Sequence, residues 1–108
     1  MTFLNQIRKK AKKKIIYTEH AVDEMLAEEE MISKDEVRHV IFNGEIIEEY
    51  PHDKRGHSCL IFAKTAKMRP MHVVCSPKED YLGIITVYVP TEDKWENNFK
   101  TRKEAEIS

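Results

Sequence analysis

Glycine, cysteine and long apolar runs are scarce in this chain of 108 residues, and each shortage narrows what the protein can be. Its three glycines are isolated, so it has neither a phosphate-binding loop nor a dinucleotide signature, which excludes nucleotide-driven chemistry. Its two cysteines, Cys59 and Cys75, form no Cys-x-x-Cys pair, so we expect no structural zinc site. The sequence therefore predicts neither a metal nor another cofactor.

Membrane and export signals are also missing. No run approaches the roughly 18 consecutive apolar residues that a membrane helix needs, and no apolar segment follows the basic N-terminus as it does in a secretory signal. Both cysteines lie in apolar, strand-like runs, where we expect them to be small buried hydrophobes of a reducing cytoplasm. The sequence therefore predicts a cytoplasmic protein without a membrane partner.

The composition is that of one folded domain. The content of 41% hydrophobic and 34% charged residues suits a globular protein with a modest core, and the chain has no repeat or low-complexity tract. We expect a single domain over residues 1–108. It would comprise a basic N-terminal helix or arm at 1–14, a core at 15–90 and a C-terminal helix or tail at 91–108.

Charge is unevenly distributed although the net charge is only −1. Residues 1–20 carry six basic residues and one acidic residue, whereas residues 21–50 carry ten acidic and two basic residues. The basic segment can hold a phosphate backbone, and Lys12, Lys13 and Lys14 are the candidate contacts. It is equally suited to be a solvated lysine face, or to pair with the acidic segment beside it.

Three N-terminal segments combine apolar residues at helical spacing with polar residues that cap helices. The first follows Thr2 and places Phe3, Leu4, Ile7 and Ala11 on one face. The second follows Thr18, with Ala21, Met25 and Leu26 as its buried stripe. The third begins at a capping box, Ser33 to Glu36, buries Val37, Val40 and Ile41, and ends at Asn43-Gly44.

Strand signals occupy most of the remaining chain. After a brief strand at Ile15–Tyr17, the candidates are Glu45–Tyr50, Ser58–Thr65, Met71–Ser76 and Leu82–Val89. The segment Thr91–Glu106 is expected to be a final helix docked by Trp95 and Phe99. The order of elements predicts an α+β fold with N-terminal helices packed on a mostly antiparallel sheet of four to five strands.

Alternation along the last two strands predicts which side chains share a face, because neighbouring side chains of a strand point to opposite sides. Met71, Val73 and Cys75 can face the core together, while His72 points the other way with Val74 and Ser76. On the following strand Ile85, Val87 and Val89 form one set, and Ile84, Thr86 and Tyr88 form the other. We expect His72 to share an open face with Thr86 or Tyr88.

Several motifs resemble a family known as domain of unknown function 4258, over about residues 17–100. The matching pieces are His20-Ala21, Ile32-Ser33 with Glu36-Val37, Gly44 to Tyr50, Ser58 to Phe62, Arg69-Pro70-Met71-His72-Val73-Val74, and Ile85-Thr86-Val87-Tyr88-Val89-Pro90 through Trp95. The family is similar in layout to the RelE/ParE-like toxins, small bacterial proteins whose helix pair packs on an antiparallel sheet. Many of those toxins cut messenger RNA without a metal and are restrained by an antitoxin.

The resemblance implies a RelE-like fold and a metal-independent endoribonuclease that acts on RNA, on the ribosome or free of it. Cleavage needs a base for the 2′-hydroxyl, an acid for the leaving oxygen and cations for the phosphate, and histidine and arginine suit these tasks. The candidates are His72 and His20 for proton transfer, Thr86 and Tyr88 for positioning, and Arg69 with the three lysines for phosphate. Each of these side chains also has a purely structural interpretation on its strand, turn or helix.

The chain departs from the family pattern on the helix after His20. Family members tend to carry arginines where this sequence has Glu24 and Glu30, a reversal of sign that repels RNA. This departure favours a second interpretation, a non-catalytic interaction module whose acidic helix binds a basic protein. A third is a toxin of the same shape that acts on a DNA-associated target.

Overall fold

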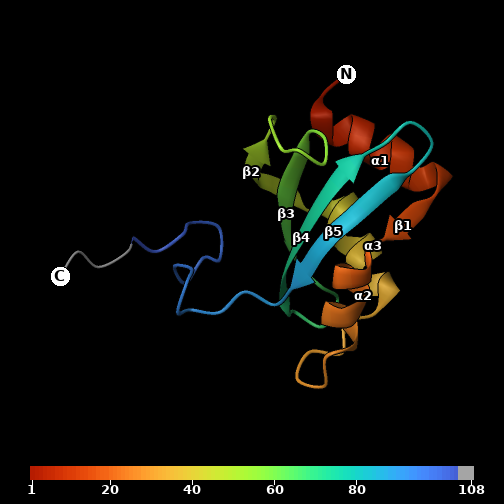
Figure 1. Ribbon diagram of the computed structural model, residues 1–108. Coiled ribbons are helices and arrows are strands. Elements are labelled where there is room, and N and C mark those ends of the chain that lie inside the picture. The colour runs from red at the N-terminus through yellow and green to blue at the C-terminus, as the bar shows by residue number, and fades with distance from the viewer. Residues whose placement is uncertain (105–108) are drawn as a thin grey trace.

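A computed structural model of the protein describes residues 1–104, which form three helices and five strands (Figure 1). The helices are α1 (Phe3–Lys13), α2 (Glu19–Leu26) and α3 (Lys34–Asn43). The strands are β1 (Ile15–Tyr17), β2 (Glu45–Tyr50), β3 (Ser58–Lys64), β4 (Pro70–Pro77) and β5 (Leu82–Tyr88). The predicted α+β class is confirmed, with five strands.

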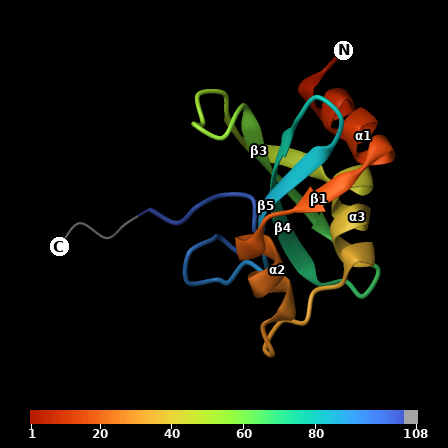
Figure 2. The same cartoon turned by 45° about the vertical axis from the view of Figure 1, so that its right-hand side comes forward.

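The five strands form one open, mixed sheet in the order β1-β5-β4-β3-β2. Strands β2 to β5 are antiparallel neighbours, whereas β1 runs parallel to β5 and pairs with it only from Leu82 to Ile84. In Figure 2 α1 and α3 lie on one side of the sheet, and the chain that follows β5 lies on the other. The two faces of the sheet are therefore covered by different parts of the chain.

All three helices begin where the sequence predicts. The side chains of Thr2, Thr18 and Ser33 each accept a hydrogen bond from a backbone N–H in the first turn of the helix that follows. Glu36 completes the capping box, since its carboxylate accepts from the backbone N–H of Ser33 at 3.2 Å. These short polar contacts decide the starts of the helices, which is why sequence alone locates them.

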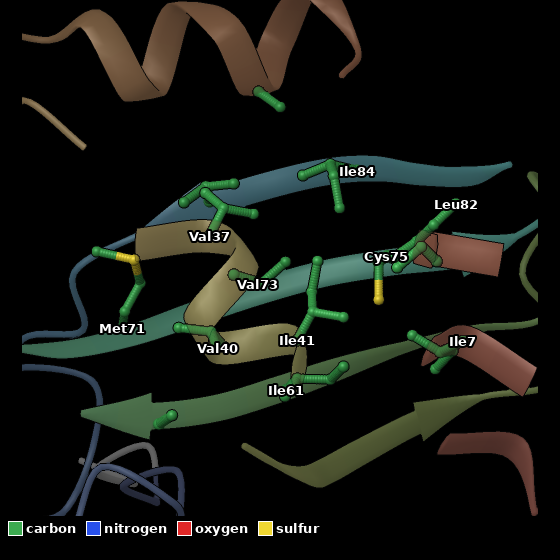
Figure 3. Close-up of a cluster of buried hydrophobic side chains, with 14 of the residues drawn as sticks. Ile7, Val37, Val40, Ile41, Ile61, Met71, Val73, Cys75, Leu82 and Ile84 are labelled. Atoms are coloured by element: carbon green, nitrogen blue, oxygen red, sulfur yellow. The ribbon is translucent and has the colours of Figure 1, made fainter. Parts of the chain in front are cut away.

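The main core lies between the helices and one face of the sheet (Figure 3). Val37, Val40 and Ile41 of α3 lie in this core, where α3 packs on β3 and β4, and Ile7 enters from α1. The N-terminal basic segment is thus a packed helix. Its Arg8 donates to the carbonyls of Ile41 at 2.9 Å and of Gly44 at 3.0 Å, tying α1 to the end of α3.

Cys59 and Cys75 are opposite each other in β3 and β4, with free, fully buried thiols, which confirms their predicted burial. A hydrogen bond with Cys59, together with burial, raises the pKa of the Cys75 thiol. Both are therefore small, unreactive core residues in the folded protein.

Three local predictions are wrong. Leu26, predicted to be buried, is 67% exposed, because α2 ends at this residue and the chain turns away. A β-bulge puts Ile84 on the core face with Val87, whereas strict alternation grouped Ile85 with Val87, because the bulge inserts one extra residue opposite β4. Residues 91–104 form no helix, and residues 105 and 106 of the predicted helix lie outside the described residues.

β1 is short, so the second half of β5 has a neighbouring strand only on its β4 side, and two carboxylates occupy the side beyond the end of β1. Glu24 accepts from the backbone N–H of Val87 at 3.0 Å, and Glu30 accepts from that of Val89 at 3.0 Å. Glu24 and Glu30 therefore satisfy backbone donors at the sheet edge, which otherwise cost free energy when unpaired.

No helix within residues 1–104 is long and apolar enough to cross a membrane.

Candidate functional site

The sheet face opposite the helices carries a row of aromatic rings centred on His72. Phe62, His72 and Tyr88 lie side by side on β3, β4 and β5. The Phe62 and Tyr88 ring centroids are 5.7 Å and 5.2 Å from that of His72, with the rings edge to face. His72 thus shares a face with Tyr88, as its strand position predicts.

This face is not open at His72, contrary to the expectation from sequence. Residues 91–103, here called the C-terminal strap, cross it and bring Trp95 within 4.4 Å of the His72 ring centroid. His72 is fully buried and Trp95 is 2% exposed. Alternation along a strand predicts the face of a side chain but not what a distant segment lays over it, so the burial of His72 could not be predicted.

Both ring nitrogens of His72 are occupied. Nε2 lies 2.6 Å from the carbonyl oxygen of Phe99 and Nδ1 lies 3.1 Å from the Tyr88 hydroxyl. A carbonyl only accepts, so Nε2 donates and Nδ1 accepts from Tyr88. Burial lowers the pKa of His72 to about 4, so the ring is neutral at physiological pH. It is an internal hydrogen-bonding residue in this structure.

A pocket of about 430 Å³ lies next to the buried imidazole, between α2, the end of β5 and the strap. The residues that line it combine an acid, a phenol and two cations: Glu24, Tyr88, Val89, Pro90, Thr91, Lys94, Trp95 and Arg102. Burial raises the pKa of Glu24, and burial also raises that of the Tyr88 phenol. A raised carboxyl pKa beside cations in a concave site is typical of functional sites.

His20 reaches the same pocket indirectly. Its Nε2 lies 3.2 Å from Glu24 Oε1, one helical turn away on α2, and its side chain is 67% exposed. The predicted pair His20 and His72 therefore does not meet. Instead each imidazole contacts one residue of the pocket, His20 through Glu24 and His72 through Tyr88.

Arg102 is the most strongly held cation of the pocket. Its guanidinium donates two hydrogen bonds to Glu48 of β2, at 2.7 and 3.0 Å, and lies 4.7 Å from the Trp95 ring centroid. The bond from Arg102 lowers the pKa of Glu48, whose carboxylate also accepts from the Tyr50 hydroxyl. The Arg102 side chain nevertheless remains 56% exposed and can meet an anion from solvent.

Arg69, predicted to bind phosphate, is engaged inside the protein. Its guanidinium forms a two-pronged pair with Glu36, at 2.7 and 3.2 Å, and donates to the carbonyl of Glu30. Burial opposes this pair, but the hydrogen bonds from Arg69 lower the pKa of Glu36. The side chain ties the loop after α2 and the start of α3 to the turn before β4.

The remaining predicted residues lie apart from the pocket. Thr86 is half-buried on β5 opposite Val74, in the row next to that of His72. Lys12 and Lys13 end α1 and Lys14 follows them, so all three belong to the side of the sheet that the helices cover. The structure therefore brings together Tyr88, His72 and, through Glu24, His20, but neither Thr86, Arg69 nor the lysines.

Sequence reasoning missed Lys94 and Arg102, and treated Glu24 only as a departure from a pattern. The available signal was Trp95, a large aromatic in a polar segment, because its neighbours must lie wherever it docks. Within residues 1–104 no three histidine, cysteine or acidic side chains lie close enough together to hold a metal ion.

The fold and the pocket define an α+β domain with an acidic, phenolic and cationic hollow at the end of its sheet. The chain belongs to the family described as a domain of unknown function, DUF4258, whose model matches residues 17–89. The matched range includes α2, α3 and strands β2 to β5, but neither α1 nor the strap. No curated protein and no solved structure matches the chain.

Proposed function

We propose that the protein is a RelE-like toxin, or a ribonuclease derived from one, that cuts RNA without a metal in the pocket beside Tyr88. The observation that supports this is the gathering of Glu24, Tyr88, Lys94 and Arg102 around one hollow. The proposal includes a cytoplasmic location, an antitoxin partner that restrains the activity, and an RNA target that is either free or on the ribosome.

The reaction proposed is attack of a ribose 2′-oxygen on the adjacent phosphorus. The new bond forms as Glu24 takes the 2′-proton, and the bond from phosphorus to the 5′-oxygen breaks as Lys94, which lines the pocket from the strap, supplies a proton to it. The products are a 2′,3′-cyclic phosphate and a 5′-hydroxyl. Tyr88 donates a hydrogen bond to the phosphate, and Lys94 and Arg102 offset its growing negative charge.

The pKa values support these roles. Burial moves the pKa of Glu24 upward, toward working pH, where a carboxylate is a more effective base. Burial also raises the pKa of Tyr88, so the phenol keeps its proton and remains a donor. His72 lies behind Tyr88 and does not line the pocket, so in this proposal it supports the phenol.

The basic helix has a separate part in the proposal. Lys12, Lys13 and Lys14 attract the RNA backbone from the helix side of the sheet, a contribution that falls as salt rises. They take no part in bond cleavage, because they lie on the other side of the sheet from the pocket.

The test is cleavage of a short, fluorescently labelled single-stranded RNA in the presence of a chelator. Glu24→Gln and Tyr88→Phe are each expected to slow cleavage by about 10²-fold or more, the usual contribution of a proton-transfer or charge-stabilising group. Glu24→Gln is well suited because the amide oxygen can still accept from Val87, so the edge of β5 keeps its hydrogen bond.

Two controls make the result specific. Glu28→Gln removes an exposed carboxylate of the same acidic segment outside the pocket and is expected to cleave at the wild-type rate. An RNA with a 2′-deoxy residue at the cleavage position must stay intact. Equal rates for Glu24→Gln and Glu28→Gln, or an inert wild-type protein, would overturn the proposal.

A non-catalytic interaction module is the second candidate, and one observation favours it. Two side chains expected to do chemistry, His72 and Arg69, are fully used in contacts within the protein. Asp23, Glu28 and Glu29 meanwhile remain exposed on and after α2, where they suit a basic protein partner. A wild-type protein that neither cuts RNA nor binds it at low salt would support this candidate.

A further inference from the structure

The C-terminal strap is folded on itself. Trp95 and Arg102 form an antiparallel bridge, the backbone N–H of Glu96 donates to the carbonyl of Thr101 at 2.8 Å, and that of Lys103 donates to Lys94 at 2.9 Å. Among the described residues, no backbone-to-backbone hydrogen bond joins the strap to the sheet. The strap is therefore a small unit held in place by side chains.

Three polar side chains of the sheet hold the strap. Glu45 pairs with Lys100 at 2.6 Å, and Glu48 takes both bonds of Arg102. The pair of Glu45 and Lys100 is exposed, where a single ion pair contributes little, whereas Glu48 is only 23% exposed and its pair with Arg102 is bidentate. The third is His72, whose buried bond to the Phe99 carbonyl lies under Trp95 and is shielded from water.

His72 contacts both walls of the pocket at once. One nitrogen holds the Tyr88 hydroxyl, which belongs to the sheet wall, and the other holds the strap, which forms the opposite wall. Both cations that line the pocket, Lys94 and Arg102, belong to the strap. Release of the strap would therefore leave the acid and the phenol of the pocket in place and remove its positive charge.

We propose that His72 is a positioning residue that fastens the strap to the sheet and thereby assembles the anion-binding half of the pocket. That this half of the pocket binds the phosphate of an RNA rests on the proposed function, but the attachment of the strap to the sheet by His72 does not. The ligand of the assembled pocket is a phosphodiester. It is bound by the cations of the strap and by the Tyr88 phenol, which the same imidazole orients.

Trp95 fluorescence reports whether the strap is attached to the sheet, because Trp95 is the one tryptophan of the chain and lies on the strap. His72→Phe keeps a ring in the cavity but removes both hydrogen bonds. It is expected to shift Trp95 emission to the red and to raise acrylamide quenching several-fold. His72→Gln, whose amide can accept from Tyr88 and donate to Phe99, should restore much of the wild-type signal.

A matched control and a binding assay complete the experiment. His39→Phe removes an imidazole that contacts the Lys64 carbonyl and does not line the pocket, so Trp95 should be unaffected. With a 2′-O-methyl RNA, which cannot be cut, His72→Phe should weaken binding about tenfold or more, as expected when charge-assisted hydrogen bonds are lost. His72→Gln should bind nearly as the wild type does, which a general loss of packing would not produce.

The outcomes separate this inference from the proposed function. If Trp95 becomes exposed in His72→Phe and the wild-type protein leaves RNA intact, the role of His72 in attaching the strap is supported and the proposed nuclease is rejected. If the wild type cleaves RNA and Trp95 stays buried in His72→Phe, the nuclease is supported and the role of His72 in attaching the strap is rejected. If His72→Phe does not fold, nitrogen NMR of the wild-type imidazole decides: the Nε2–H tautomer supports the fastening, and the Nδ1–H tautomer overturns it.

Discussion

The buried imidazole of His72 predicts a loss of stability in mild acid. Desolvation lowers its pKa to about 4 and outweighs the bond to Phe99 and the attraction of Glu48, while Arg102 acts in the same direction as desolvation. In the unfolded chain the ring regains its ordinary value of 6.5. As the pH falls from 6.5 to about 4, the unfolded chain binds a proton that the folded protein does not.

The magnitude follows from the size of the pKa shift. At about 1.4 kcal/mol for each pKa unit, the shift corresponds to about 3 kcal/mol of unfolding free energy. This contribution is complete above pH 6.5, disappears progressively as the pH falls toward about 4, and changes no further below that value. Glu36 and Glu48 act in a different range, since their lowered pKa values remove stability only below about 4.5.

Urea unfolding followed by far-UV circular dichroism measures this effect. The wild type and His72→Gln are compared at pH values from about 7 down to about 4.5, so that every other titrating group cancels in the difference. The wild type should lose stability faster than the variant throughout this interval. Parallel curves would refute the reasoning, because they would mean that the imidazole binds its proton equally well in both states.

Two further pairs of substitutions test how tightly the backbone is packed and whether its N–H groups need their hydrogen-bond acceptors. Gly44→Ala should destabilise the protein by about 2 kcal/mol in urea unfolding, because its Cβ would lie 2.5 Å from the Val40 carbonyl oxygen. Gly83→Ala, whose Cβ meets nothing closer than 3.6 Å, should be nearly neutral, and equal losses would contradict this account. Glu30→Ala should cost about 1 kcal/mol and speed hydrogen exchange at Val89, whereas Glu30→Gln, which keeps an acceptor, should leave exchange unchanged.

Local chemistry made most of the fold predictable. The caps at Thr2, Thr18 and Ser33 and the apolar periodicity of each element are short-range signals, and they placed the start of each of the three helices and the bounds of each strand to within one residue. The parallel pairing of β1 with β5 joins segments far apart in the chain, and no local pattern encodes it. The bulge at Ile85 was missed for a related reason, because a bulge is a property of two paired strands.

The candidate site was only partly predictable. Period-two alternation placed Tyr88 and His72 on one face, but the strap that covers them comes from a segment with no periodic signal. A polar stretch with one tryptophan resembles the start of an aromatic-anchored helix, whereas the structure forms a small bridge between Trp95 and Arg102. From the sequence, Glu24 was interpreted only by its negative charge. Its contact in the structure is the backbone N–H of Val87, which is available because β1 ends before it reaches that residue.

The opposed thiols of Cys59 and Cys75 are an internal probe of how often the folded protein opens. They sit on adjacent strands in the middle of the sheet and are sealed from solvent. Both thiols belong to the core between the helices and the sheet, so an alkylating reagent reaches them only after that core has opened, and the rate of labelling reports how often it opens. Loosening of the strap on the opposite face should leave this rate untouched.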